Sequence, residues 1–261
     1  MTLPTVAGNW DRMSGYREKF NEDLALWVQG FPPVLKYYII RNRRELIDVL
    51  ADAMPPFVAY SLFREHGIAA RRAVDLFAGI GGWSLGLALY LYPNPLYVEA
   101  VEIDARKASL LRVLFKFVKD FYDDFEYNII VKDVRNYEIP KGIDIITASP
   151  PCEDLTPLNA FQDFKEYKGT VELTEVFVEK TKNLRVPIFY ENVYSKKLAD
   201  LLTTAGFIVT KEDFSKYIPQ RRIRLIATKN VPRQSSILEF LSINWGVYRD
   251  EDWPAREVRT R

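Results

Sequence analysis

The chain has 261 residues, a formal net charge of +1 and a hydrophobic content of 48%. This length suits one domain or one domain with a small appendage, and the apolar content supports a large core. A single cysteine excludes a disulfide framework, and the near-zero charge excludes a chain wrapped in nucleic acid, so any DNA binding requires a local basic face. No stretch reads as a signal peptide or a transmembrane segment, so we expect a cytoplasmic protein.

Apolar periodicity and turn residues predict helices that alternate with strands. The expected helices are at about 20–29, 43–52, 56–66, 83–91, 105–120, 171–183 and 195–205. The expected strands are at about 73–77, 96–103, 127–131, 143–148, 186–190, 206–210 and 222–228. This alternation predicts an α/β fold whose sheet is mainly parallel and covered by helices on both faces.

The first expected strand runs into a glycine-rich turn, Ala78-Gly79-Ile80-Gly81-Gly82, and a helix follows. Glycines permit a tight turn and a close approach of the backbone to a ligand. The next strand ends in Glu102 and Asp104, and an acid at that position accepts hydrogen bonds from ribose hydroxyls. Together these features predict a nucleotide-cofactor unit.

The only cysteine, Cys152, follows the strand at 143–148 and two prolines. A strand that ends in a loop at the sheet edge places its next residues at the crevice where α/β proteins bind ligands. The alternative is a buried structural cysteine, since free cysteine is among the most buried residue types.

Two further segments place polar groups at strand ends. Glu191 follows the strand at 186–190, and Arg222 and Arg224 share one face of the strand at 222–228. Singly, each is explained as a solvated side chain. Jointly with Cys152 they indicate a site that handles a polar ring.

These segments resemble the cytosine-C5 methyltransferases that use S-adenosylmethionine. The segments similar to the family's motifs, in family order, are Asp75-Leu76-Phe77-Ala78-Gly79-Ile80-Gly81-Gly82, Pro151-Cys152, Glu191-Asn192-Val193 and Gln220-Arg221-Arg222-Ile223-Arg224. The resemblance covers residues 71 to about 229 and implies the seven-stranded, Rossmann-like methyltransferase sheet, whose last strands form an antiparallel hairpin. It also implies DNA methylation on a flipped-out base, as in restriction–modification.

Two more segments resemble motifs that the family carries after its arginine motif, but here they precede the glycine turn. Residues 26–32 are similar to the ninth motif, and residues 50–59, with Asp52 and Ala53, to the tenth. We therefore expect a circular permutation: residues 1–70 form a helical segment with these motifs, 71–229 the catalytic core, and 230–261 a tail. The alternative is an unrelated helical extension.

The resemblance assigns catalytic roles to four residues. The Cys152 thiolate would attack carbon 6 of cytosine, which makes carbon 5 nucleophilic, and Glu191 in its protonated form would serve ring nitrogen 3. Arg224 would contact the base carbonyl and Arg222 would support the catalytic loop, and their positive charge favours the thiolate.

The resemblance also assigns S-adenosylmethionine contacts. Phe77 and Ile103 would lie against adenine, Glu102 would take the ribose hydroxyls, and Asp133 with Val134 would bind the adenine amino group. The remaining expected cofactor contacts are Asp75, Ala78, Gly79, Ile80, Gly81, Gly82, Pro151, Leu173, Asp52 and Ala53. We expect no metal site, because the sequence has no Cys/His cluster.

Three departures from the family pattern leave a second function open. Glu153 and Asp154 follow the nucleophile, Asp52 replaces the usual asparagine, and no large recognition region is present. A catalytically weak cofactor-binding subunit is the alternative, and RNA is an alternative substrate. Because sequence is read at base edges by a dedicated surface, we expect a separate recognition subunit or oligomerisation through the terminal segments. Their aromatic residues include Trp10, Tyr16, Trp245, Tyr248 and Trp253.

Overall fold

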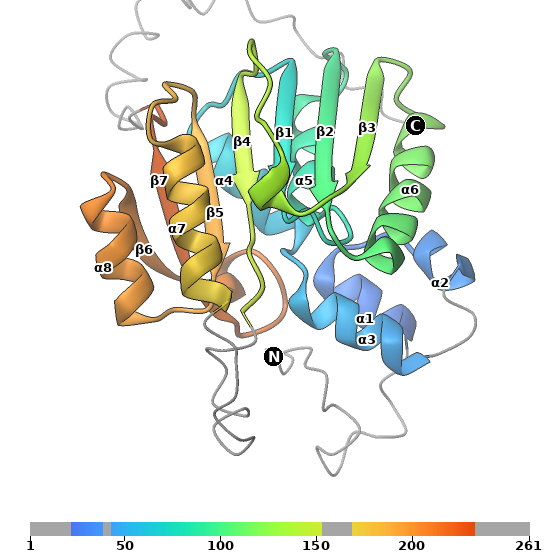
Figure 1. The fold of residues 1–261 in the computed structure, drawn as a ribbon. Coiled ribbons are helices and arrows are strands. Elements are labelled where there is room, and N and C mark those ends of the chain that lie inside the picture. Colours follow the sequence, from blue (N-terminus) through green and yellow to red (C-terminus); the bar gives the residue numbers. More distant parts are fainter. Residues whose placement is uncertain (1–21, 39–42, 153–168, 233–261) are drawn as a thin grey trace, which may run out of the picture.

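The computed structural model describes residues 22–38, 43–152 and 169–232. Their centre is a seven-stranded sheet in the order β3-β2-β1-β4-β5-β7-β6 (Figure 1). Its strands are β1 (Arg72–Leu76), β2 (Leu96–Glu102), β3 (Phe125–Val131), β4 (Ile145–Ala148), β5 (Ile188–Asn192), β6 (Ile208–Asp213) and β7 (Ile223–Lys229). The first five are parallel, and β7 runs antiparallel to both β5 and β6. The expected sheet and its final hairpin are confirmed.

Helices cover both faces of the sheet, as Figure 1 shows. They are α1 (Glu22–Gln29), α2 (Val34–Tyr38), α3 (Arg43–Asp52), α4 (Pro56–Glu65), α5 (Gly82–Leu91), α6 (Ala105–Lys119), α7 (Gly169–Thr181) and α8 (Lys196–Thr204). No helix among the residues described is long and apolar enough to span a membrane.

Two apolar cores form, one on each side of the sheet. Phe63 of α4 and Leu85 of α5 belong to the first core, with Phe189 of β5. Phe177 of α7 and Leu198 of α8 belong to the second core. Alternate residues of a strand point to opposite faces, so each central strand contributes to both cores.

The segment before β1 packs onto the core of the same unit. Its helices α1 and α3 lie near the ends of the parallel strands (Figure 1), and the Gln29 side chain donates to the Leu50 carbonyl at 2.6 Å. Gln220, just before β7, donates to the Gln29 side chain at 2.9 Å. The two bonds are buried and span 21 and 191 positions in sequence, respectively.

Three local features differ from the sequence prediction. Helix α2 was not expected, because its five residues are too few to show a helical period. Glu191 lies inside β5, where it pairs with Ile226 of β7, since the apolar stretch that predicted the strand ends one residue earlier. Arg222 precedes β7 instead of belonging to it.

Candidate active site

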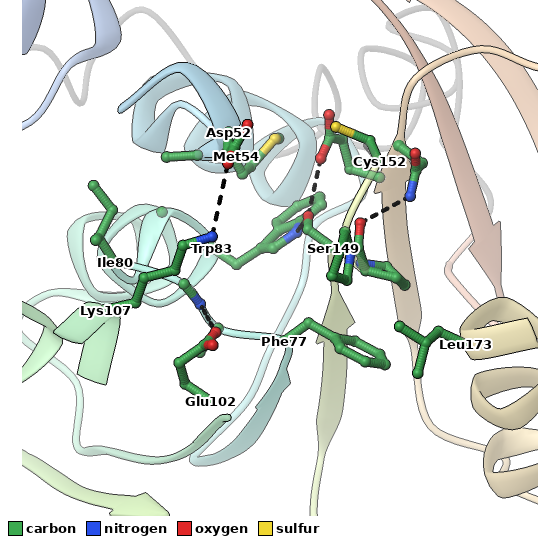
Figure 2. Close-up of a pocket in the computed structure, with 18 of the residues that line it drawn as sticks. Asp52, Met54, Phe77, Ile80, Trp83, Glu102, Lys107, Ser149, Cys152 and Leu173 are labelled. Atoms are coloured by element: carbon green, nitrogen blue, oxygen red, sulfur yellow. Dashed lines mark hydrogen bonds and ion pairs between the residues drawn. The ribbon is translucent and has the colours of Figure 1, made fainter. Parts of the chain in front are cut away.

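A cavity opens at the carboxyl ends of β1, β2, β4 and β5 (Figure 2). Its empty space is about 1120 Å³ when the part open to solvent is included. All residues expected at the catalytic and cofactor sites line it, except Asp75 and Gly81. The structure therefore brings together residues from segments that lie up to about 170 positions apart in sequence.

Cys152 is half-buried at one end of the cavity, on a loop held by two side chains from other elements. Asn192 Nδ2 donates to the Pro150 carbonyl at 2.9 Å, and Thr170 Oγ1 donates to the Pro151 carbonyl at 2.8 Å. Burial raises the pKa of the Cys152 thiol to about 11, and the carboxylates of Asp52 and Glu191 add to this effect.

The expected influence of the arginines on the thiol is present but does not dominate. Arg224 and Arg222 both lower the pKa of Cys152, yet burial outweighs them. A thiol with a pKa of about 11 is mostly protonated at neutral pH.

Glu191 is buried in the cavity wall, with only 3% of its surface exposed. Its Oε1 lies 3.2 Å from Arg224 Nε, and its Oε2 accepts a hydrogen bond from Ser149 Oγ at 3.0 Å. Trp83 Nε1 in turn donates to Ser149 Oγ at 2.9 Å. The carboxylate therefore has a fixed orientation beside the cysteine loop.

Arg222 carries donors that the described residues leave unused. It is 3% exposed, and its Nε and Nη1 have no hydrogen-bond partner within the described segments. Burial, with the neighbouring charge of Arg224, lowers the pKa of Arg222 to about 9. Buried unsatisfied donors are costly, so these atoms are suited to an acceptor on a ligand or on a chain segment.

The other end of the cavity is lined by a buried acid and an exposed apolar side chain. Glu102 is buried at the end of β2, where its carboxylate accepts hydrogen bonds from the backbone N–H groups of Gly79 at 2.7 Å and Asp104 at 2.8 Å. These bonds hold the Glu102 carboxylate at the end of β2, the position from which an acid accepts hydrogen bonds from ribose hydroxyls. Ile103 is 62% exposed beside it, an apolar surface suited to the face of a ring.

Phe77 adds a sign of local strain at the same place. Its φ of 56° lies in the left-handed region, which is rare for a bulky side chain and concentrates at functional sites. Figure 2 shows its ring on the same side of the cavity as Leu173. Asp133, also in the lining, caps a short helical turn by accepting from the Arg135 N–H at 2.8 Å.

Asp75 and Gly81 need a correction, because neither lines the cavity. Asp75 is fully buried behind the glycine turn, where it accepts hydrogen bonds from Ser84 Oγ at 2.5 Å and Thr147 Oγ1 at 2.8 Å. Gly81 faces α6: a Cβ there would lie 2.5 Å from Leu111 Cδ1. Both residues support the glycine turn from the side that faces away from the cavity.

The sequence reasoning missed several lining residues. They are Val49, Met54, Trp83, Val101, Lys107, Arg135, Ser149, Pro150, Asn192 and Val193. Asn192 and Val193 belong to the Glu191-Asn192-Val193 motif and Ser149 lies close to the Pro151-Cys152 motif, a signal that could have found them. Lys107 gives no such signal, because a lysine in an amphipathic helix reads as a solvated side chain.

Some expected features lie outside the described residues. Glu153, Asp154 and the terminal aromatic residues belong to this group. Within the segments that are described, no group of three or more His, Cys, Asp or Glu side chains could hold a metal ion.

Comparison with known proteins gives one family match. A family model described as "C-5 cytosine-specific DNA methylase" matches residues 71–227. A search of the curated proteins found no match.

One solved structure shows the same fold, and two others are similar to this chain with lower scores. A possible methylase from Clostridium difficile 630 superposes with a TM-score of 0.51 at 12% identity, over 69% of this chain and 54% of that one. A DNMT2 mutant from Spodoptera frugiperda is 22% identical, with a TM-score of 0.43 over 61% of this chain and 50% of that one. A Pyrococcus abyssi tRNA (uracil-54, C5)-methyltransferase is 15% identical, with a TM-score of 0.43 over 67% of this chain and 38% of that one. This chain thus spans only about half or less of the length of these three proteins.

Proposed function

This chain belongs to the C-5 cytosine-specific DNA methylase family, and we propose that it transfers a methyl group from S-adenosylmethionine to carbon 5 of cytosine in DNA. One observation carries this proposal. One cavity is lined by Cys152, Glu191, Arg222 and Arg224, which come from three separate segments. The other end of the same cavity is lined by Glu102 and an exposed apolar side chain.

The proposed reaction begins at Cys152. Its thiolate forms a bond to carbon 6 of the cytosine ring, and the ring electrons then make carbon 5 a nucleophile. S-adenosylmethionine, when bound, would supply the methyl group to carbon 5 and would leave as S-adenosylhomocysteine. A proton acceptor then removes the carbon 5 proton, the bond from sulfur to carbon 6 breaks, and the aromatic ring returns.

Glu191, Arg222 and Arg224 would contact the cytosine base or the loop beside it during this reaction. Glu191 is held beside the cysteine loop by Ser149 and Arg224, so a base placed there would meet an oriented carboxyl group at ring nitrogen 3. Arg224 would contact the base carbonyl. The unused donors of Arg222 would bond the loop that follows the nucleophile or the target nucleotide.

The cofactor end is assigned to the residues that line it. Glu102 would bind the ribose hydroxyls, Phe77 and Ile103 the adenine, and Asp133 with Val134 the adenine amino group. A target base must leave its stack to reach Cys152, because a paired cytosine keeps its ring inside the duplex.

A catalytically weak subunit is the second candidate function. It is favoured by the raised pKa of the Cys152 thiol, which burial and two nearby carboxylates produce. In that case the chain would bind S-adenosylmethionine but would not methylate nucleic acid by itself.

Covalent trapping tests the proposed function. With S-adenosylmethionine present, duplex DNA that contains 5-fluorocytosine should form an adduct that survives denaturation, because the fluorine cannot leave as a proton does. Cys152→Ala should abolish the adduct. An adduct that persists in this variant would remove the proposed nucleophile, and adduct formation on 5-fluorocytosine RNA but not on DNA would transfer the proposal to RNA.

We also propose the circular permutation. It is supported by the position of Asp52, Ala53 and Met54, which precede β1 in sequence but line the cavity beside the glycine turn. A rearranged chain in which residues 22–70 follow residue 229 should still bind S-adenosylhomocysteine. Loss of binding by a folded rearranged chain would contradict the permutation.

How the protein selects its target stays a prediction. The aromatic residues expected to contribute lie outside the described segments. If a separate partner provides recognition, the purified chain should methylate DNA without a fixed motif; if a second copy provides it, the methylating species should be an oligomer. Bisulfite sequencing that shows a motif of at least about four bases, by a chain that sediments as a monomer, would contradict this.

A further inference from the structure

A basic and aromatic surface borders the cavity on the side of β5, β7 and β6. Tyr194 follows Val193, and Ile223 precedes Arg224, and both Val193 and Arg224 line the cavity. The Lys211 ammonium of β6 lies over the Tyr194 ring, 4.9 Å from the ring centroid. We refer to Tyr194, Lys211 and Ile223 together as the rim.

The strand register places the rim at the carboxyl end of β5. Leu225 of β7 is opposite Asn192 of β5 on one side and Lys211 of β6 on the other. Alternate residues of a strand share a face, so Ile223 points to the same side as Leu225. Because β7 lies between β5 and β6, the contact between Tyr194 and Lys211 crosses the start of β7.

The rim is exposed and is not used by the two apolar cores. Tyr194 is 41% exposed and Ile223 is 36% exposed, and neither belongs to either core. Lys211 is exposed as well. A cation above a tyrosine face is attracted to the ring, so the contact orients the ring without enclosing it. The rim therefore presents an oriented aromatic surface to solvent.

Cationic side chains outnumber anionic ones around the rim. Lys196 and Lys197 begin α8, which packs beside β6 (Figure 1), and Lys196 lies close enough to the Tyr194 hydroxyl for an electrostatic interaction. The cations are Lys196, Lys197, Lys211, Lys216 and Arg221, and the anions are Asp200, Glu212 and Asp213. A surface with this balance of charge favours a polyanion.

We propose that the rim binds the DNA strand beside the target nucleotide, with the Lys211 ammonium on a phosphate and the Tyr194 ring stacked on a neighbouring base. A base that occupies the cavity has neighbours on its own strand, and that strand leaves the cavity across its border. Ammonium groups contact phosphates without regard to sequence, and aromatic rings stack on every kind of base. This inference rests on the proposed function, since it takes DNA as the substrate.

Two probes separate the two contacts. A single-stranded oligodeoxynucleotide offers phosphates and bases, whereas an abasic deoxyribose-phosphate oligomer of the same length offers phosphates alone. Fluorescence anisotropy, with S-adenosylhomocysteine bound, would give the affinity for each probe at several salt concentrations. Lys211→Gln should weaken the binding of both probes and reduce the slope of log K against log salt by about 0.7, the value for one phosphate contact on a single strand.

Tyr194 is tested by the difference between the probes. Tyr194→Leu should weaken binding of the oligodeoxynucleotide by about fivefold or more, which corresponds to at least about 1 kcal/mol for stacking on one base. Binding of the abasic oligomer should stay within about twofold, with its salt slope unchanged. Tyr194→Phe keeps the ring, so it should bind the oligodeoxynucleotide within about twofold of the unmodified chain.

Matched controls lie toward the amino ends of the parallel strands. Phe121→Leu changes an aromatic residue before β3 that is 49% exposed, and Lys116→Gln removes one exposed charge from α6. Neither residue lines the cavity, and neither change should alter the affinity for either probe. Unfolding midpoints near that of the unmodified chain would show that each variant keeps its fold.

The outcomes separate this inference from the proposed function. The inference would be overturned by equal losses of both probes in Tyr194→Leu, by no loss in Tyr194→Leu or Lys211→Gln, or by equal losses in the control variants. The proposed function would still stand if the unmodified chain forms the covalent adduct with 5-fluorocytosine DNA. Absence of that adduct from the unmodified chain would overturn the proposed function, and this inference with it.

Discussion

Ser149 donates its hydroxyl proton to Glu191 Oε2 at 3.0 Å while its own oxygen accepts the Trp83 indole N–H at 2.9 Å. The direction of this chain is fixed, because an indole N–H can only donate. The tryptophan comes from the helix after the glycine turn, the serine from the end of β4 and the glutamate from β5. The chain therefore connects the cofactor turn to the catalytic carboxyl group.

The first prediction concerns this serine. Ser149→Ala should reduce kcat by about tenfold, because a hydrogen bond to a charged group contributes roughly 1.5–3 kcal/mol. The affinity for S-adenosylhomocysteine should stay within about twofold of the unmodified value, since the affected group is the carboxyl at the base. Steady-state kinetics and calorimetry would measure the two quantities.

A matched control is Ser109→Ala. Ser109 lies on the exposed face of α6, where its hydroxyl donates to the Ala105 carbonyl at 2.8 Å, so its removal should leave kcat unchanged. If Ser149→Ala weakened cofactor binding as much as it slowed turnover, the serine would support the whole cavity and not Glu191 in particular.

The second prediction uses a close approach at the glycine turn. A Cβ at Gly82 would overlap the backbone carbonyl oxygen of Met54, which is part of the cavity lining. Gly82→Ala should therefore lower the free energy of unfolding, by about 1–3 kcal/mol as for other overpacked sites. It should also weaken S-adenosylhomocysteine binding, because the displaced backbone borders the ligand.

Gly86→Ala separates the two effects. Gly86 lies on the same helix, and a Cβ there would lie 2.5 Å from Ala59 Cβ and 2.6 Å from the Pro56 carbonyl oxygen. It does not line the cavity. It should destabilise the fold and leave binding by the folded protein unchanged. If Gly82→Ala bound S-adenosylhomocysteine normally, this would show that the glycine turn accommodates the added Cβ without disturbing the cavity.

The third prediction concerns the stability of the chain as a function of pH. Burial raises the pKa of Asp75 from 3.8 to about 7, although the hydroxyls of Ser84 and Thr147 oppose this. The folded state thus binds its proton more tightly than the unfolded state. The contribution of Asp75 is therefore most favourable below about pH 4 and is lost as the pH rises to about 7.

Asp75→Asn should remove this dependence. As the pH rises from about 4 to 7, the free energy of unfolding of the variant should increase relative to that of the unmodified chain. Denaturant unfolding at several pH values would measure it. A difference that stays constant over this range would mean that the pKa of Asp75 is the same in the folded and unfolded states.

The sheet and most of the site could be predicted because their signals are local. Each strand is a short apolar segment, and a residue placed just after such a segment lies at the carboxyl edge. This reasoning located Cys152 and Glu102 at the cavity, whereas Asp133 was located there by the family resemblance. The resemblance placed Asp75 there too, although membership of a motif does not say which way a strand residue points.

Other parts of the site depend on contacts between distant segments. Lys107 lines the cavity because α6 and the end of α3 pack near one another, and the helical pattern of either segment is equally compatible with solvent. The left-handed backbone of Phe77 is likewise not expected from a bulky residue type. Tertiary packing decides both features.

The last prediction concerns the reactivity of the single thiol. Because the chain has one cysteine, alkylation by iodoacetamide reports on Cys152 alone. The pKa of about 11 means that the thiolate fraction, and with it the rate, should rise about tenfold per pH unit between about pH 7 and 10. Asp52→Asn should lower the pKa of Cys152, because it removes a negative charge that opposes ionisation and leaves Lys107 without its partner.

The variant should therefore alkylate faster than the unmodified chain by the same factor at every pH in this range, and that factor gives the change in the pKa. Asp200→Asn removes an exposed carboxylate on α8 that pairs with Lys196 and does not line the cavity, so it should leave the rate unchanged. A rate that stays the same in Asp52→Asn would mean that solvent screens this carboxylate from the thiol. An equal acceleration in both variants would indicate a general effect of net charge and not a contact within the site.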